Sequence, residues 1–384
     1  MAMGVFVMPK LKHMVCAASA ALIAFWFAAG PAAFAQEAAD FGKPGEKVTL
    51  TVGYQPYYTE AWSALVMKAK GFWKKYLPAG SEVDFEPGLQ GSVLVGQMIA
   101  GKQQIAYMGD MPAIIASARP EVSDIRIVAV LGTSQQQCNV FLVRKDAPDF
   151  KSAEDAVKWM NGKVVASPQG SCTDRFAREV FQKLSVKPDK YFNQSGDQIA
   201  ANFKAGKLDA AVVWEPIAAK LIDDGLARRA ASGVSFNETD AGFLVMRHDL
   251  AAARPDVEKA WLEAELDAQM FLADPKNASE ITAIAAAEAK GYPSKVLWNA
   301  LYGDYPAALG GSADRLTFDY VLTDKVKAQL AEATAFLFDL KRVPAQTLRQ
   351  DALADDVARS VLAARGLKSP IGAIKSQTRA ASAQ

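Results

Sequence analysis

The 384-residue chain has few of the side chains on which catalytic and metal sites depend. It contains 2 His and 3 Cys. Two His leave little from which to build a His-based metal site or a catalytic triad, and three Cys exclude a disulfide scaffold or a Cys-rich zinc module. An excess of one charge is also absent, because 43 Lys and Arg face 42 Asp and Glu. This balance argues against a nucleic-acid partner, and we predict neither a metal nor a cofactor.

The N-terminus has the pattern of a targeting segment. Two lysines precede an uncharged apolar stretch over residues 14–29, and Ala33-Phe34-Ala35 follows as an Ala-x-Ala cleavage pattern. The stretch is shorter than the about 20 apolar residues of a membrane-spanning helix, which argues against the alternative of a retained anchor. The sequence therefore predicts an exported protein whose signal peptide, residues 1–35, is cleaved after Ala35.

The rest of the chain has an ordinary globular composition, with 51% hydrophobic and 22% charged residues, and a length that suits about two domains. Strand-like and helix-like segments alternate in two series. The predicted strands are 48–54, 82–85, 105–108, 125–131, 139–144, 163–166, 208–213 and 242–247. From Pro255 onward the pattern is helical, and beyond Gly366 it is small and basic.

This alternation predicts an α/β protein with two lobes, each a mainly parallel sheet flanked by helices, with C-terminal helices. The expected divisions are 36–133 for the first part of lobe I, 134–240 for lobe II, 241–365 for the return to lobe I and the C-terminal helices, and 366–384 for a disordered tail.

The loops at the strand ends are the candidate site, because ligands of open α/β sheets bind beyond the carboxyl ends of the strands. No residue is expected to be catalytic or to bind a metal. The candidate ligand-binding residues are Tyr54, Gln55, Tyr57, Tyr58, Gln90, Gly91, Ser92, Asp110, Met111, Ser171, Cys172, Thr173, Trp214 and Glu215.

Two of these loops, at residues 90–92 and 170–173, lead into predicted helices. Their backbone N–H groups and hydroxyls could hold an anionic oxygen, although their Ser and Thr residues could equally be ordinary helix caps. The Tyr residues, Gln55 and Trp214 could wall and orient an organic ligand, or could pack between the lobes.

Asp110 and Glu215 are acids at strand ends. If both face the cleft they would repel a bare anion, and they would then accept hydrogen bonds from a ligand that carries donors. Pairing with Arg175 and helix capping are the alternatives. Cys138 and Cys172 leave a disulfide open, since its geometry requires Cα atoms within about 7 Å.

Eight short segments carry a family resemblance over residues 48–275. They include Val52-Gly53-Tyr54-Gln55, Ile99-Ala100-Gly101-Lys102-Gln103-Gln104-Ile105-Ala106, Gly109-Asp110-Met111-Pro112, Phe203-Lys204-Ala205-Gly206-Lys207-Leu208-Asp209-Ala210 and Val213-Trp214-Glu215-Pro216. In this order they resemble the type II periplasmic solute-binding proteins of ABC importers, in the branch that binds nitrate, sulfonates and taurine and includes binding proteins for thiamine pyrimidine precursors.

The resemblance implies a monomeric periplasmic protein that closes around a ligand by hinge motion. The lobes would be joined by crossings near residues 131–134 and 240–243. The ligand would be a small organic anion, sulfonate- or taurine-like or an aromatic carboxylate, delivered to an inner-membrane permease with its cytoplasmic ATPase.

Three alternatives remain. The ligand could be a nitrogen heterocycle such as a thiamine pyrimidine precursor, or the protein could present its ligand to a membrane sensor kinase. Some members of the superfamily are enzymes that use a Cys-rich segment with His; this chain has no such segment, and His248 follows the return strand. The chain is therefore predicted not to be an enzyme.

Overall fold

The computed structural model describes residues 40–378, which belong to one compact unit. The predicted signal peptide and its cleavage site lie outside the described residues. Within the described part of the chain, no helix is both long and apolar enough to cross a membrane.

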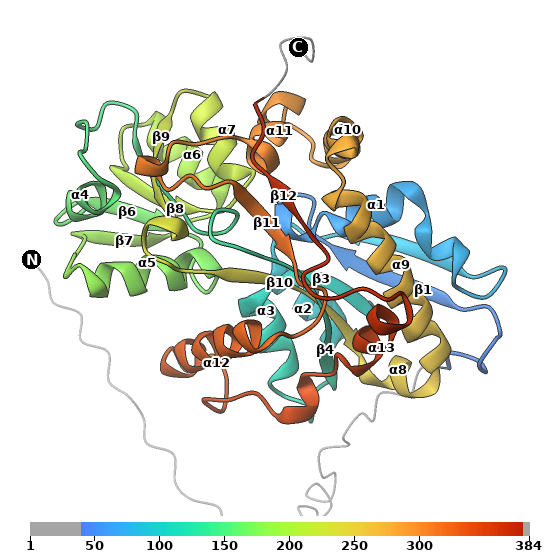
Figure 1. The fold of residues 1–384 in the computed structure, drawn as a ribbon. Coiled ribbons are helices and arrows are strands. Elements are labelled where there is room, and N and C mark those ends of the chain that lie inside the picture. Colours follow the sequence, from blue (N-terminus) through green and yellow to red (C-terminus); the bar gives the residue numbers. More distant parts are fainter. Residues whose placement is uncertain (1–39, 379–384) are drawn as a thin grey trace, which may run out of the picture. The chain divides into compact units, whose positions relative to one another are not determined.

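The chain builds two β-sheets with helices packed on them (Figure 1). The first sheet has the strand order β12-β11-β4-β10-β3-β1-β2 and the second β7-β6-β8-β5-β9. The strands of the first sheet are β1 (Thr49–Tyr54), β2 (Glu82–Pro87), β3 (Ile105–Gly109), β4 (Ile125–Ser134), β10 (Asp240–Arg247), β11 (Asp314–Phe318) and β12 (Gly372–Lys375). Those of the second are β5 (Val140–Arg144), β6 (Val164–Ser167), β7 (Lys190–Asn193), β8 (Ala210–Val213) and β9 (Ala227–Ser232).

The predicted α/β class with two lobes is confirmed, and each sheet is mixed rather than purely parallel. Strands β1, β2 and β3 run parallel, as do β6, β7 and β8. Strand β10 is antiparallel to β3 and β4, and β5 is antiparallel to β8 and β9. Both β5 and β10 follow a connection from the other sheet. Each of these two strands therefore begins at the edge of its sheet where the neighbouring strands end, and runs antiparallel to them.

Those two connections span residues 135–139 and 233–239. They lie next to the predicted crossings, whose own residues pair with each other inside the first sheet: Ser134 opposite Asp240 and Gly132 opposite Gly242.

The core explains why the strands are apolar on both faces. Along β3, Ile105 and Tyr107 join one buried cluster, with α1 (Ser63–Lys70) and α9 (Pro255–Ala273). Ala106 and Met108 join a second, with α2 (Gly91–Ile99), α3 (Asp110–Ser117) and α12 (Asp324–Asp339). The first sheet is thus covered on both faces, as expected of an α/β sheet.

The second sheet is built in the same way. Its helices are α4 (Ala153–Lys158), α5 (Cys172–Lys183), α6 (Gly196–Lys204) and α7 (Ile217–Asp223). The remaining helices are α8 (His248–Ala253), α10 (Ala278–Glu288), α11 (Ser294–Tyr302) and α13 (Asp356–Ala364).

Two expectations about the C-terminal part of the chain are wrong. Residues after Pro255 include the strands β11 and β12, and β12 lies inside the segment expected to be disordered. The two strands pair antiparallel at the edge of the first sheet. Short edge strands such as Gly372–Lys375 have too few residues to show a pattern, and they depend on the neighbouring strand and on packing against helices such as α9.

Apolar side chains at helical spacing predict one helix over residues 61–75, but the structure interrupts it. Gly71 has φ +64° and ends α1, and a 3-10 turn over Phe72–Lys75 follows. A left-handed residue at the C-terminal end is a common way for a helix to end.

Candidate functional site: a pocket between the two sheets

A cavity of about 510 Å³ is lined by loops from both sheets, within the usual size of small-molecule sites. Its walls come from the segments that follow β1, β3, β6, β7 and β8, together with the start of α2 and the chain after α12. The lining residues are Gln55, Tyr58, Gln90, Gly91, Ser92, Val95, Gly96, Gly109, Pro112, Ile115, Pro168, Gln169, Gly170, Ser171, Cys172, Asn193, Gln194, Ser195, Trp214 and Arg342.

More than half of the predicted ligand-binding residues line this pocket. They are Gln55, Tyr58, Gln90, Gly91, Ser92, Ser171, Cys172 and Trp214. The rule that ligands bind beyond strand ends brought them together from four separate loops.

Two helix starts in the pocket have no side-chain cap. Helix α2 follows Gln90 and α5 follows Ser171, and no side chain accepts a hydrogen bond from the first turn of either helix at its N-cap. By contrast, Ser195 and Gln198 form a complete capping box at the start of α6. The first N–H groups of a helix lack intrahelical partners, and at a helix start without a side-chain cap they form a favourable environment for an anionic group.

The hydroxyls of the second loop are engaged with one another. Ser171 Oγ donates to Pro168 O at 2.5 Å and lies 2.8 Å from Thr173 Oγ1, which is also 2.8 Å from Ser167 Oγ. Thr173 is fully buried and does not line the pocket. Thr173 therefore does not reach the pocket, as its predicted role as a ligand contact would require. Instead, its hydroxyl holds the loop that carries Ser171.

Close packing explains the glycine at the first helix start. A Cβ on Gly91 would lie 2.4 Å from Pro112 Cγ, so only glycine lets α2 approach α3 at this point. The start of α2 is thereby brought against the pocket wall formed by Pro112 and Ile115.

Trp214 forms the wall on the side of the second sheet. Its indole Nε1 donates to Tyr57 O at 2.8 Å, a hydrogen bond between loops of the two lobes. Gln55 Nε2 donates to Tyr107 O at 3.3 Å, which fixes the amide of Gln55. A rigid aromatic face and an oriented amide suit an organic ligand.

Three predicted residues from the ends of β1 and β3 lie elsewhere. The Tyr54 hydroxyl donates to Glu288 at 2.6 Å and accepts from Lys68 at 2.9 Å. The Tyr57 hydroxyl donates to Lys290 O at 3.3 Å. Met111 is fully buried in the core under α3. Aromatic and apolar residues at a strand end can turn to either side of the loop, and the sequence alone does not show which side.

Asp110 is buried and paired with a cation of the other lobe. Arg175 Nη2 lies 3.3 Å from Asp110 Oδ2 and donates to Thr239 O at 3.0 Å. Burial raises the pKa of Asp110, and the charge of Arg175 opposes that rise. The sequence left several roles open for Asp110. In the structure Asp110 pairs with Arg175, and its carboxylate does not line the pocket.

Two further carboxyls, Glu60 and Asp240, are buried beside Asp110. The Tyr58 hydroxyl donates to Glu60. Burial and the charge of Asp240 raise the pKa of Glu60 well above its usual range. Burial and the charge of Asp110 raise the pKa of Asp240 to about 8. Such a group of acids cannot all ionise beside one guanidinium.

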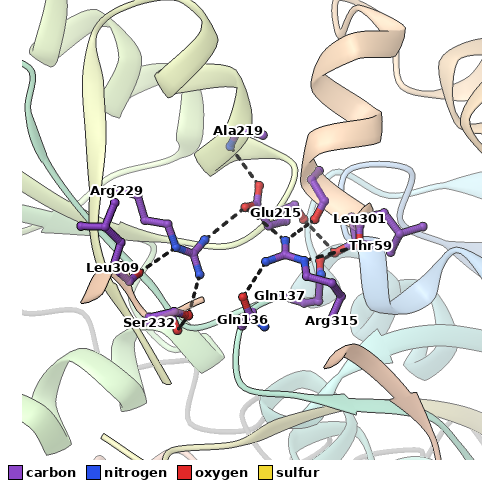
Figure 2. A network of polar contacts seen from close by, with 12 residues as sticks. Thr59, Gln136, Gln137, Glu215, Ala219, Arg229, Ser232, Leu301, Leu309 and Arg315 are labelled. Atoms are coloured by element: carbon purple, nitrogen blue, oxygen red, sulfur yellow. Dashed lines mark hydrogen bonds and ion pairs between the residues drawn. The ribbon is translucent and has the colours of Figure 1, made fainter. Parts of the chain in front are cut away.

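Glu215 is the centre of a separate buried network (Figure 2). Its Oε1 lies 3.6 Å from Arg229 Nη1 and 3.9 Å from Arg315 Nη2, and its Oε2 accepts from Ala219 N at 2.9 Å. The Tyr305 ring lies 4.3 Å from the Arg229 guanidinium and 5.1 Å from that of Arg315. Burial raises the pKa of Glu215, against the charges of both arginines, and lowers the pKa of Arg229 to about 10.

The network joins the two lobes. Arg315, on β11 of the first sheet, donates to Gln136 Oε1 and to Ala300 O, both at 2.7 Å. Glu215 follows β8 of the second sheet, and its backbone carbonyl accepts from Thr59 N at 3.3 Å. Glu215 therefore holds the crossing region together and does not line the pocket.

The question of the cysteines is answered by a disulfide between Cys138 and Cys172, whose Cα atoms are 6.1 Å apart. It ties the crossing at residues 135–139 to the start of α5, so Cys172 lines the pocket as half of a cystine. Both sulfurs lie within 4.8 Å of a carboxylate oxygen of Asp240. Because the sulfurs are bonded to each other, they offer no thiolate to a metal.

Several lining residues were not predicted. Residues 193–195 follow β7, a strand whose sequence Lys-Tyr-Phe-Asn is too short and polar to stand out. Arg342 lies beyond α12, more than a hundred residues after the last predicted site residue. The spacing of Ser195 and Gln198 is a capping signal that could have placed the start of α6.

A larger cavity of about 680 Å³ lies apart from these strand ends, lined by residues of α7, α11, 303–305 and 377–378. Its charged lining residues include Asp223 and Lys295, which pair with each other at 2.8 Å. None of the predicted site residues lines it.

Comparison with known proteins agrees with this fold. The chain matches the NMT1-like family over residues 43–286. It is 26% identical over 316 residues to the taurine-binding periplasmic protein of Escherichia coli (strain K12), covering 78% of this chain and 89% of that protein.

Solved structures show the same fold. The alkanesulfonate-binding protein SsuA from Xanthomonas axonopodis pv. citri, bound to MOPS, superposes with a TM-score of 0.63 at 19% identity over 81% of this chain and 98% of its own. The desulfurization enzyme DSZB superposes with a TM-score of 0.60 at 19% identity over 83% of this chain and 99% of its own, so the fold by itself does not separate binding from catalysis. The family match and the homology to the taurine-binding protein confirm the resemblance drawn from the sequence: the chain belongs to the NMT1-like family.

Proposed function

We propose that the chain is the periplasmic solute-binding subunit of an ABC importer. It captures a small organic anion in the pocket between the sheets and delivers it to an inner-membrane permease with a cytoplasmic ATPase. The observation that carries this proposal is a pocket with two uncapped helix starts, α2 and α5, one on each lobe. Helix N-termini with free N–H groups favour an anion.

The remaining walls suit an organic body rather than a bare inorganic ion. Val95, Ile115 and Trp214 supply apolar surface, and Gln55, Gln90 and Asn193 supply amides. A cavity of about 510 Å³ is far larger than nitrate requires. The relatives are named for taurine and alkanesulfonates, which are organic anions.

Catalysis is disfavoured by the same lining. Among the described residues that line the pocket there is no His, Asp or Glu, and Cys172 is bonded to Cys138. A nucleophile needs a base within hydrogen-bond reach, and the pocket offers none. A role in uptake also agrees with export, since the taurine-binding relative is periplasmic.

A thermal-shift screen of the exported protein tests the proposal. The panel comprises alkanesulfonates, taurine, aromatic carboxylates, nitrate and thiamine pyrimidines. A ligand that binds only the native state stabilises it by about 2.7 kcal/mol at a hundredfold excess over its Kd. We expect one class of organic anion to raise the Tm. A response to pyrimidines alone, or turnover of any compound, would contradict the proposal.

The delivery step needs a separate observation. We expect genes for a permease and an ATPase beside this gene, and loss of uptake of the identified anion when the gene is deleted. A sensor-kinase gene in that place, with uptake intact, would instead support presentation of the ligand to a sensor.

A further inference from the structure

Arg342 is the one residue with a formal positive charge among the described residues that line the pocket. Its position is set by the end of α12. Lys341 has φ +57°, Lys341 N donates to Phe338 O at 2.8 Å, and Arg342 N donates to Leu337 O at 2.9 Å. These two bonds form a Schellman motif, which ends the helix sharply and places Arg342 at the pocket rim.

The buried arginines near the lobe boundary already have acidic partners. Arg175 pairs with Asp110, and Arg229 and Arg315 share Glu215. For the Arg342 side chain, residues 40–378 provide no ion pair or hydrogen bond, and the side chain is exposed. A guanidinium presents five N–H donors in a planar fork that matches carboxylate or sulfonate oxygens.

The electrostatic environment of the pocket is therefore positive. Arg342 and two helix starts attract negative charge, and the two acids expected to face the cleft are buried in pairs of their own. An ammonium group in this pocket would meet a cation and partial positive charges without a carboxylate to compensate it. Amides and hydroxyls alone do not replace that carboxylate.

Resting on the proposed function, we propose that Arg342 pairs with the acidic group of the ligand and that the ligand carries no ammonium group. The pocket thereby selects simple sulfonates or carboxylates over amino-sulfonates such as taurine. This reverses the expectation, drawn from Asp110 and Glu215, of a ligand rich in donors.

The test is calorimetry with ethanesulfonate and taurine, which differ by one ammonium group, followed by the best anion of the screen. We expect ethanesulfonate to bind at least tenfold more tightly than taurine. Arg342→Gln should lower the affinity for the best anion by about tenfold to a hundredfold, as expected for the loss of a charge-assisted hydrogen bond. Its Tm without ligand should stay unchanged, because the side chain is exposed.

Lys341→Gln is the matched control. It removes the same charge from the neighbouring residue, which does not line the pocket, and should change affinity less than twofold. Equal effects of the two substitutions, or taurine binding as tightly as ethanesulfonate, would overturn the inference. If no anion binds the wild-type protein, the proposed function itself fails.

Discussion

The pocket and the buried network behind it use arginine in opposite ways. At the pocket rim Arg342 is exposed and has no acidic partner among the described residues. Around Glu215, Arg229 and Arg315 are almost fully buried and share a single carboxylate. Both regions hold an excess of positive charge. Burial decides what that excess does: a buried excess must be balanced inside the protein, whereas an exposed one remains available to a ligand.

Glu215→Gln should have the largest effect, because it removes the buried carboxylate that Arg229 and Arg315 share. We expect a loss of about 3–5 kcal/mol in the free energy of unfolding, as for other broken buried ion pairs. Urea denaturation measures it. Asp223→Asn, which breaks the surface pair with Lys295, is the control and should cost less than about 1 kcal/mol. A loss that small for Glu215→Gln would show that the carboxylate is dispensable.

The disulfide lies between the two regions and should rank second. Replacing Cys138 and Cys172 together by Ser removes a cross-link between positions 34 residues apart, worth about 3–4 kcal/mol of stability in the chain-entropy treatment. Since Cys172 begins α5 at the pocket, ligand affinity should fall as well. Parallel calorimetry and urea titration separate the two effects. Unchanged affinity in the folded variant would mean that α5 is held without the cross-link.

Trp214 joins the regions, because it lines the pocket and precedes Glu215. Trp214→Ala should lower the affinity for the ligand by about 30-fold, equivalent to about 2 kcal/mol for a buried aromatic anchor. This loss of affinity is separate from any loss of stability. The control is Trp159→Ala, which removes a tryptophan of the same lobe that packs on Phe150 away from the pocket. If both variants bind alike, Trp214 is a packing residue only.

The acids beside Arg175 should make stability depend on pH. The folded Asp240 carboxyl keeps its proton up to about pH 8, whereas an unfolded Asp loses it near pH 4. The native state therefore binds more protons in this window, and stability falls as the pH rises through it, by at most about 1.4 kcal/mol per pH unit for one proton.

Asp240→Asn should flatten that fall, leaving the parts contributed by Glu60 and by two other carboxyls with a raised pKa, Glu179 and Glu265. Urea titrations at pH 5 and pH 8 test this, and the variant should gain on the wild-type protein at pH 8. A wild-type stability that rises over this range would contradict the assignment of the proton to Asp240.

Much of the fold could be predicted from local sequence patterns. Segments such as Thr49–Tyr54 and Ile125–Ser134 were predicted within a few residues, because they are rich in the β-branched and apolar residues typical of strands. The strands that were missed, β7, β9, β11 and β12, are short or carry charges such as Arg228 and Arg229. Their pairing depends on a neighbouring strand and not on their own composition.

The site divides in the same way. The loops at residues 90–92 and 170–172 were predictable from strand-end and helix-start signals. Arg342 was not, because a residue after α12 reaches the pocket only through the packing of that helix on α3.

The sequence by itself determined that this is a two-lobed α/β protein of its family, and it indicated the strand ends as the candidate site. Strand order and loop position follow from local patterns that the sequence contains. The tertiary structure decided the sign of the charge that faces the pocket. Whether a carboxylate faces a ligand or an arginine depends on which side of its loop it turns to. Asp110 and Glu215 turn inward, because buried guanidiniums brought from distant parts of the chain require them there.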